Sequence, residues 1–168
     1  FGSVDAGMFH LTTHGFFKAL LFLGAGAVLH SIHRANATVD DVGGIGWRRM
    51  PLTAAVFAIG VLALAGVPPF SGFFSKEEVL AAVLAKGNLL YLVLALGASF
   101  LTALYMTRLY ALLFSGQPRG EAGRTHDPEP SMAVPLVALA ALAIVAGAGM
   151  APVLGGFLHD GKAFAINP

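Results

Sequence analysis

Long apolar stretches alternate with short polar connections along this chain. The apolar segments run from about 6 to 33, from 51 to about 86, from 88 to 114 and from 132 to about 158. Polar connections lie at 34–50, at a short turn around 86–88, and at 115–131. A helix needs about 20 apolar residues to cross the hydrocarbon core of a bilayer. The pattern therefore predicts an all-α, polytopic transmembrane helix bundle of about four crossings, with residues 1–168 forming one membrane domain.

The second apolar segment is interrupted in its middle. Pro68 and Pro69 are followed closely by Ser71 and Gly72. Proline removes a backbone hydrogen bond and clashes with the preceding turn, so two in succession should open the helix. We expect one discontinuous crossing, helical over 51–67 and again over 73–86. Unwound backbone at membrane depth occurs where it is buried in protein or lines a wet cavity. A re-entrant hairpin, or two short helices meeting at the surface, is the alternative.

Composition supports a membrane protein. Hydrophobic residues make up 57% of the chain and charged residues 11%, whereas soluble domains carry about 25% charged residues. The net charge of +1 and the lack of a basic run give no reason to expect nucleic acid. Because cysteine is absent, disulfides and cysteine-ligated iron–sulfur clusters are excluded in this chain. No signal peptide is visible, and a chain that starts at Phe1 is expected to be a piece of a longer protein.

The basic residues predict the orientation in the membrane. With four crossings, the connections 34–50 and 115–131 share one side. That side carries more arginine and lysine than the other, namely Arg34, Arg48, Arg49, Arg119 and Arg124 against Lys86 and Lys162. The positive-inside rule then places both connections in the cytoplasm. Arg108, near the end of the third segment, is interpreted as an anchor that reaches toward the same side or as a partner of another helix.

The first apolar segment contains three residues that could transfer protons. His10, His14 and Lys18 follow one another at intervals of four residues. Successive helical residues advance by about 100°, so all three fall on one narrow face. Imidazole can accept a proton on one nitrogen and release another from the second. A lysine at the bilayer centre is costly, usually faces a polar interior, and marks an ion or proton path. This face is therefore predicted to carry protons.

A second intramembrane lysine, Lys76, stands just after the helix break, with Glu77 and Glu78 beside it. Discontinuous helices hold ion and substrate sites in secondary transporters, so Lys76 and Glu77 are further candidates for proton transfer. The alternative is a lysine–carboxylate pair that only stabilises the bundle. His30 and His33 lie near a helix end and are interpreted as structural. His10 and His14 have the spacing of a metal-binding pair, but the helix offers a cationic lysine instead of a third ligand, so no metal is expected.

These residues also carry a resemblance to a known family. AGMFHLTTHGFFKALLFLGAGAVLH (6–30), MPLT (50–53), LAGVPPFSGFFSKEE (64–78) and LTALYMTR (101–108) resemble the subunit L family of the proton-translocating NADH–quinone oxidoreductase, respiratory complex I. The resemblance covers nearly the whole chain and is most specific over residues 6–114. It is weaker in the polar linker and the fourth segment. Complete members are several times longer, so the chain would be a piece of the C-terminal half.

The resemblance implies a role in proton translocation. Family members are similar to cation/proton antiporters and carry charged residues along the middle of the membrane. His10, His14 and Lys18 match the family's histidine–lysine helix, Lys76 matches the lysine after its helix break, and Glu77 matches a position where aspartate is common. No cofactor is implied in this chain. NADH, FMN, iron–sulfur clusters and quinone would belong to other subunits. The family's glutamate–lysine pair would lie in the N-terminal half.

The implied partners are other membrane subunits of complex I, especially a sister antiporter-like subunit, and the bilayer, which is expected to be a bacterial inner membrane. Three rival functions remain open. The nearest is the large subunit of a multisubunit sodium/proton antiporter, which shares Phe-Lys-Ala and a lysine after a Pro-Pro break. The second is a haem- or metal-binding membrane anchor that uses His10, His14 or His30. The third is a purely structural assembly subunit.

Overall fold

The chain folds into a bundle of long helices. The computed structural model describes residues 4–32, 42–120, 122 and 125–160, so His33, Arg34, Arg124 and Lys162 lie outside the described residues. The helices are α1 (Val4–Ser31), α3 (Pro51–Ala65), α4 (Ser71–Ala85), α5 (Leu89–Phe114) and α6 (Pro130–Asp160). The predicted all-α membrane bundle is confirmed, with α3 and α4 in the place of the discontinuous crossing.

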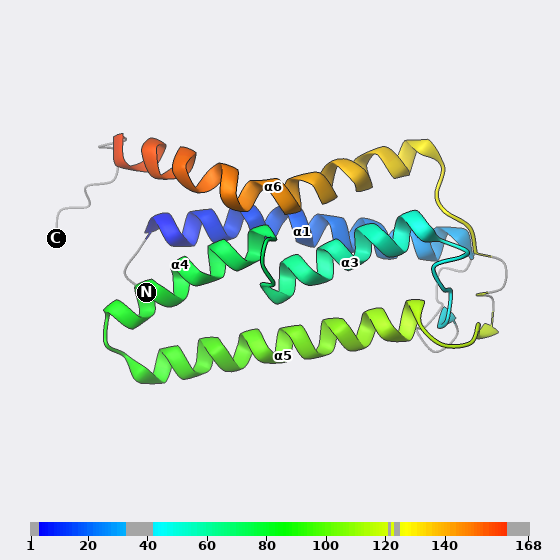
Figure 1. Cartoon of the computed structure of the whole chain (residues 1–168), viewed down its shortest axis with the longest axis horizontal. Helices are drawn as coiled ribbons and strands as arrows, with labels where there is room; N and C mark the ends of the chain where they lie inside the picture. The colour runs from blue at the N-terminus through cyan, green and yellow to red at the C-terminus, as the bar shows by residue number, and fades with distance from the viewer. Residues whose placement is uncertain (1–3, 33–41, 121, 123–124, 161–168) are drawn as a thin grey trace.

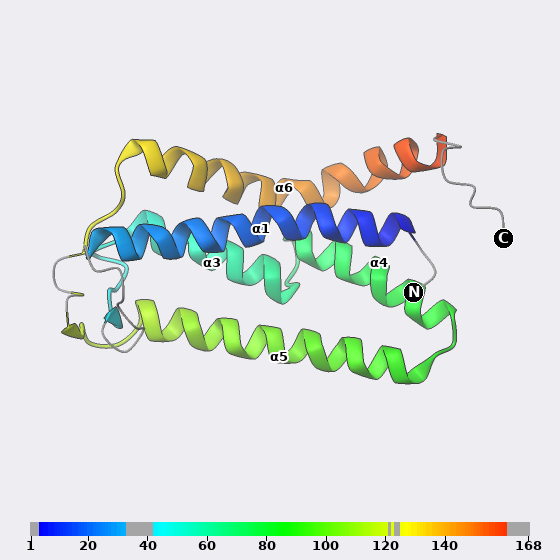
Figure 2. The same ribbon diagram turned by 180° about the vertical axis from the view of Figure 1, so that it is seen from behind.

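The helices lie roughly along one long axis, with α3 and α4 following each other end to end (Figure 1). Both α3 and α4 pack against α1 on one side and α5 on another, and α6 packs against α1, α3 and α4. The turn between α4 and α5 lies at one end of the bundle. The connections before α3 and after α5 lie together at the other end, as the four-crossing pattern predicted (Figure 2).

Three helices among the described residues are long and apolar enough to cross a membrane. They cover Ala6–Ser31, Leu89–Phe114 and Pro130–Gly147, and α3 is a shorter apolar helix. Helix α5 buries few side chains within this chain, so most of its apolar surface faces outward. Such a surface fits a bilayer or further membrane helices, where apolar side chains need not be hidden from water.

The break lies two residues earlier than the sequence predicted, at 66–70 instead of 68–72. Helix α3 ends at Ala65 and α4 begins at Ser71, so Ser71 and Gly72 form the first turn of α4 and do not belong to the break. Gly66 has φ of 81° and its backbone N–H donates to the carbonyls of Leu62 and Ala63. Glycine adopts this left-handed conformation without a steric penalty and ends helices for that reason. The two prolines follow within the break.

A carboxylate from the connection between α5 and α6 binds the N-terminal end of α3. The Asp127 carboxylate accepts hydrogen bonds from the backbone N–H of Leu52 at 2.9 Å and of Thr53 at 3.0 Å. It also accepts from the hydroxyl of Thr53 at 2.9 Å. The first N–H groups of a helix have no partner within the helix, and a negative charge there is favourable. Asp127 therefore caps α3 from about 75 residues further along the chain.

Replacing Asp127 by alanine is expected to lower the free energy of unfolding by about 1–2 kcal/mol, the usual cost of losing a helix N-cap. Thermal unfolding of the purified complete protein, followed by intrinsic fluorescence, measures the change. Glu129→Gln is the matched control, because Glu129 is an exposed carboxylate of the same connection. An Asp127→Ala protein as stable as Glu129→Gln would show that the cap contributes little.

Candidate functional site

Lys76 lies against the carbonyl end of the broken helix. Its Nζ donates a hydrogen bond of 2.6 Å to the backbone carbonyl of Leu64, in the last turn of α3. That carbonyl has no partner inside the helix, because the chain turns away at Gly66. The carbonyl end of a helix carries partial negative charge, which favours a cation. The Lys76 ammonium therefore binds the C-terminal end of α3, and the Asp127 carboxylate binds its N-terminal end.

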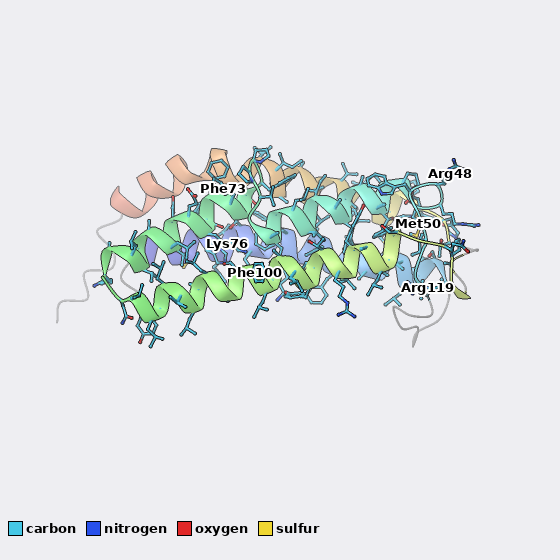
Figure 3. All side chains as sticks on the ribbon, turned by 60° about the horizontal axis from the view of Figure 1, so that its bottom comes forward. Arg48, Met50, Phe73, Lys76, Phe100 and Arg119 are labelled. Carbon is cyan, nitrogen blue, oxygen red and sulfur yellow. The ribbon has the colours of Figure 1, made fainter. Side chains whose placement is uncertain are left out.

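The two half-helices approach each other closely at this point. A Cβ atom at Gly72 would collide with the backbone carbonyl of Ala63. A Cβ at Gly66 would lie 3.1 Å from Cδ of Lys76. Glycine is required at 72 because backbone fills the space beside it, and at 66 because a φ of 81° is left-handed. Figure 3 shows Lys76 well inside the length of the bundle, away from Arg48 and Arg119 at the end that carries the connections.

Helix α1 brings a histidine pair beside the same turn of α4. The His10 ring Nδ1 lies 3.0 Å from the hydroxyl of Ser75, the residue before Lys76. The His10 and His14 ring centroids are 5.6 Å apart in an edge-to-face arrangement. His14 packs in the same manner on Phe17, with centroids 5.1 Å apart. Phe17 is fully buried in the core. The predicted proximity of His10 and His14 is therefore seen, and His10 also reaches α4.

Lys18 and Glu77 differ from the other three predicted site residues in being exposed. Lys18 is exposed on α1, on a surface that also carries the exposed side chains of Leu11 and Phe22. Glu77 and Glu78 are exposed on α4. Lys76 uses a backbone carbonyl as its hydrogen-bond partner, so the lysine–carboxylate pair that was the alternative is not needed to explain its position. Of the five predicted residues, the structure gathers His10, His14 and Lys76 around the start of α4.

Three groups near Lys76 or α3 were not among the predicted site residues. The Leu64 carbonyl could not be, because it is a backbone atom whose availability depends on where α3 ends. Ser75 could have been found as a polar residue on a helix next to a lysine, but nothing in the sequence pairs it with His10. Asp127 lies in a linker rich in proline and charge, where a cap for a distant helix has no local signature.

The remaining candidates lie near the surface. His30 and Arg108 are exposed in this chain. Among the described residues, no group of three or more histidine, aspartate or glutamate side chains is arranged to hold a metal ion. The buried polar side chains in the first turns of α4 are instead hydroxyls, those of Ser71 and Ser75.

Comparison with known proteins places this chain in a family. Residues 1–102 match the family described as NADH:quinone oxidoreductase/Mrp antiporter, transmembrane. NADH-quinone oxidoreductase subunit L of Pseudomonas aeruginosa is 41% identical over 160 residues, which cover 95% of this chain and 25% of that protein. The chain thus spans about a quarter of the length of the curated relatives that it matches.

Two solved structures share the fold over most of the chain. One is the membrane-bound sulfane sulfur reductase, an archaeal respiratory membrane complex, with a TM-score of 0.84 and 25% identity, covering 96% of this chain and 26% of that one. The other is the Mrp complex from Dietzia, with a TM-score of 0.77 and 25% identity, covering 90% and 36%. From the match over residues 1–102 and these likenesses, this chain belongs to the NADH:quinone oxidoreductase/Mrp antiporter transmembrane family.

Proposed function

We propose that this chain is part of a proton-translocating, antiporter-like subunit of an NADH–quinone oxidoreductase. The observation that carries the proposal is the Lys76 ammonium on the free carbonyl end of a broken helix, with the His10–His14 pair beside the same turn. A lysine in that position can hold a proton as an ammonium and release it when its surroundings change. Histidine can take up a proton and release it again. Together they supply titratable groups from α1 to the break.

Lys18 is proposed as the next group of the path. A lysine in the middle of a membrane helix needs polar neighbours, whereas its surface on α1 is exposed in this chain. The relatives are about four times longer, so the remainder of such a protein is proposed to cover this surface and to supply those neighbours. Glu77, exposed one residue after Lys76, is proposed as a carboxylate that faces the same continuation.

The energy for translocation is proposed to come from redox chemistry in other subunits, which would hold NADH, FMN, iron–sulfur clusters and quinone. The expected partners are the other membrane subunits, including a sister antiporter-like subunit. A bacterial inner membrane is the proposed location, in keeping with the bacterial relatives. The end that carries Arg48, Arg49 and Arg119 is proposed to face the cytoplasm, because basic residues are retained on that side.

Lys18→Ala in the complete complex tests this function. We expect several-fold fewer protons translocated per NADH oxidised, with near-normal amounts of assembled complex, because Lys18 is not part of the packed core of this chain. Proton uptake by inverted membrane vesicles, divided by the rate of NADH oxidation, is the measurement. Lys86→Ala is the control, since Lys86 is an exposed lysine in the turn after α4. A wild-type ratio of protons translocated to NADH oxidised in Lys18→Ala would contradict the proposal.

A second candidate is the large subunit of a sodium/proton antiporter, which the structural likeness to the Mrp complex favours. The two functions differ in what drives the protons. In the complete protein, an oxidoreductase subunit moves protons when NADH is supplied and does so without sodium. An antiporter subunit collapses an imposed pH gradient when sodium is added and does not respond to NADH.

A further inference from the structure

The Ser75 hydroxyl lies between the histidine pair and the helix break. It is fully buried, 3.0 Å from His10 Nδ1 and 3.4 Å from the backbone carbonyl of Gly72. We infer that Ser75 is a positioning residue that holds the His10 ring through Nδ1 in every protonation state, so that His10 exchanges protons through Nε2. The inference rests on the proposed function, because it concerns how one member of the path is kept in place.

A hydroxyl suits this task because it can donate one hydrogen bond and accept others. When Nδ1 carries a proton, in one neutral tautomer or in the imidazolium, the ring donates to Ser75 Oγ and the hydroxyl donates to the Gly72 carbonyl. Exchange at Nε2 takes the ring between these two states and leaves the proton on Nδ1, so both hydrogen bonds of the hydroxyl are kept. The bond to Gly72 is the longer of the two.

The His10 ring is therefore held by a hydrogen bond at Nδ1 only. Nδ1 keeps a hydrogen bond as the proton count changes, whereas Nε2 is left as the nitrogen that gains and loses a proton. If the His10 ring could flip, either nitrogen could take Nε2's place, and proton exchange would no longer occur at one fixed position. With His14 edge-to-face at 5.6 Å, a fixed His10 ring keeps the geometry of the pair constant.

Ser75 also ties the histidine pair to the lysine. Ser75 and Lys76 are neighbours on α4, and one contacts α1 through His10 while the other contacts α3 through Leu64. The start of α4 is packed against the end of α3 at Gly72 and Ala63. A movement of α4 would shift Ser75, which anchors His10, and Lys76, which binds the Leu64 carbonyl, in one step.

Ser75→Ala and Ser71→Ala in the complete complex form a matched pair. Both serines are fully buried in the first turns of α4, but among the described residues the Ser71 hydroxyl has no hydrogen-bond partner. We expect Ser75→Ala to lower protons translocated per NADH by about three- to tenfold, the factor that corresponds to one ordinary hydrogen bond. Ser71→Ala should match the wild type. Equal ratios in the two variants would overturn the inference.

A double-mutant cycle separates positioning from packing. His10→Leu and Ser75→Ala are each expected to lower the ratio, and the double variant should be no worse than His10→Leu alone, because the hydrogen bond is then already lost. Losses that multiply would overturn the inference. If Lys18→Ala keeps a wild-type ratio, the proposed function fails. If Lys18→Ala impairs translocation while Ser75→Ala does not, only the role of Ser75 fails.

Discussion

Lys76→Arg in the complete complex is expected to assemble normally and to lose proton translocation by tenfold or more. Arginine keeps the positive charge and can still donate to the Leu64 carbonyl, so the contact that joins α4 to α3 is preserved. Its guanidinium does not give up its proton in proteins, whereas a lysine can. The measurement is protons translocated per NADH oxidised, together with the amount of complex on a native gel.

Lys76→Met completes the comparison. Methionine fills the space but removes the donor, and a buried carbonyl left without a partner costs about 1–3 kcal/mol. We expect this variant to lose translocation and, unlike the arginine variant, some assembled complex as well. Wild-type translocation in Lys76→Arg would mean that the lysine serves only as a fixed positive charge on α3.

Gly72→Ala is expected to have the largest effect on assembly. The added Cβ would collide with the Ala63 carbonyl, which is backbone and cannot turn away as a flexible side chain can. Separating α3 from α4 should destabilise the protein by about 3 kcal/mol, the upper range for overpacking, and should break the Lys76–Leu64 bond. The amount of the complete protein in membranes, measured by immunoblot, should fall severalfold.

Gly97→Ala is the control for that substitution. Gly97 lies within α5, and a Cβ there would meet nothing within 4 Å. The change should be neutral or slightly stabilising, because alanine is the better helix former by about 1 kcal/mol. Normal amounts of Gly72→Ala protein would contradict the close packing of the two half-helices.

The apolar pattern was enough to predict the helices and the place of the break. Length and hydropathy predict apolar helices on both sides of Pro68 and Pro69. The two prolines predict the break between them, because a helix does not continue through two successive prolines. The start of α4 was predicted two residues late. Ser71 and Gly72 are residue types that favour breaks, but both lie in the first turn of α4, where Gly72 is needed for the contact with Ala63.

The candidate site was predicted only as far as spacing reaches. Four-residue intervals place His10 and His14 on one face of α1, and their rings do lie together. Spacing along one helix says nothing about which other helix that face meets, so the contact of His10 with Ser75 was not foreseen. Nor does it say how exposed Lys18 is. That depends on which helices surround α1.

The opposite charges at the two ends of α3 bear on how the membrane voltage can act on this helix. Helix α3 has no charged residue of its own, and together with the Asp127 carboxylate bound at its start and the Lys76 ammonium bound at its end it carries no net charge. A rigid displacement of it along the membrane normal then does no net electrical work. Loss of the Lys76 proton leaves one negative charge, worth about 2.3 kcal/mol per 100 mV over the full membrane thickness. Deprotonation of Lys76 would thus make α3 with its bound Asp127 carboxylate sensitive to the membrane voltage.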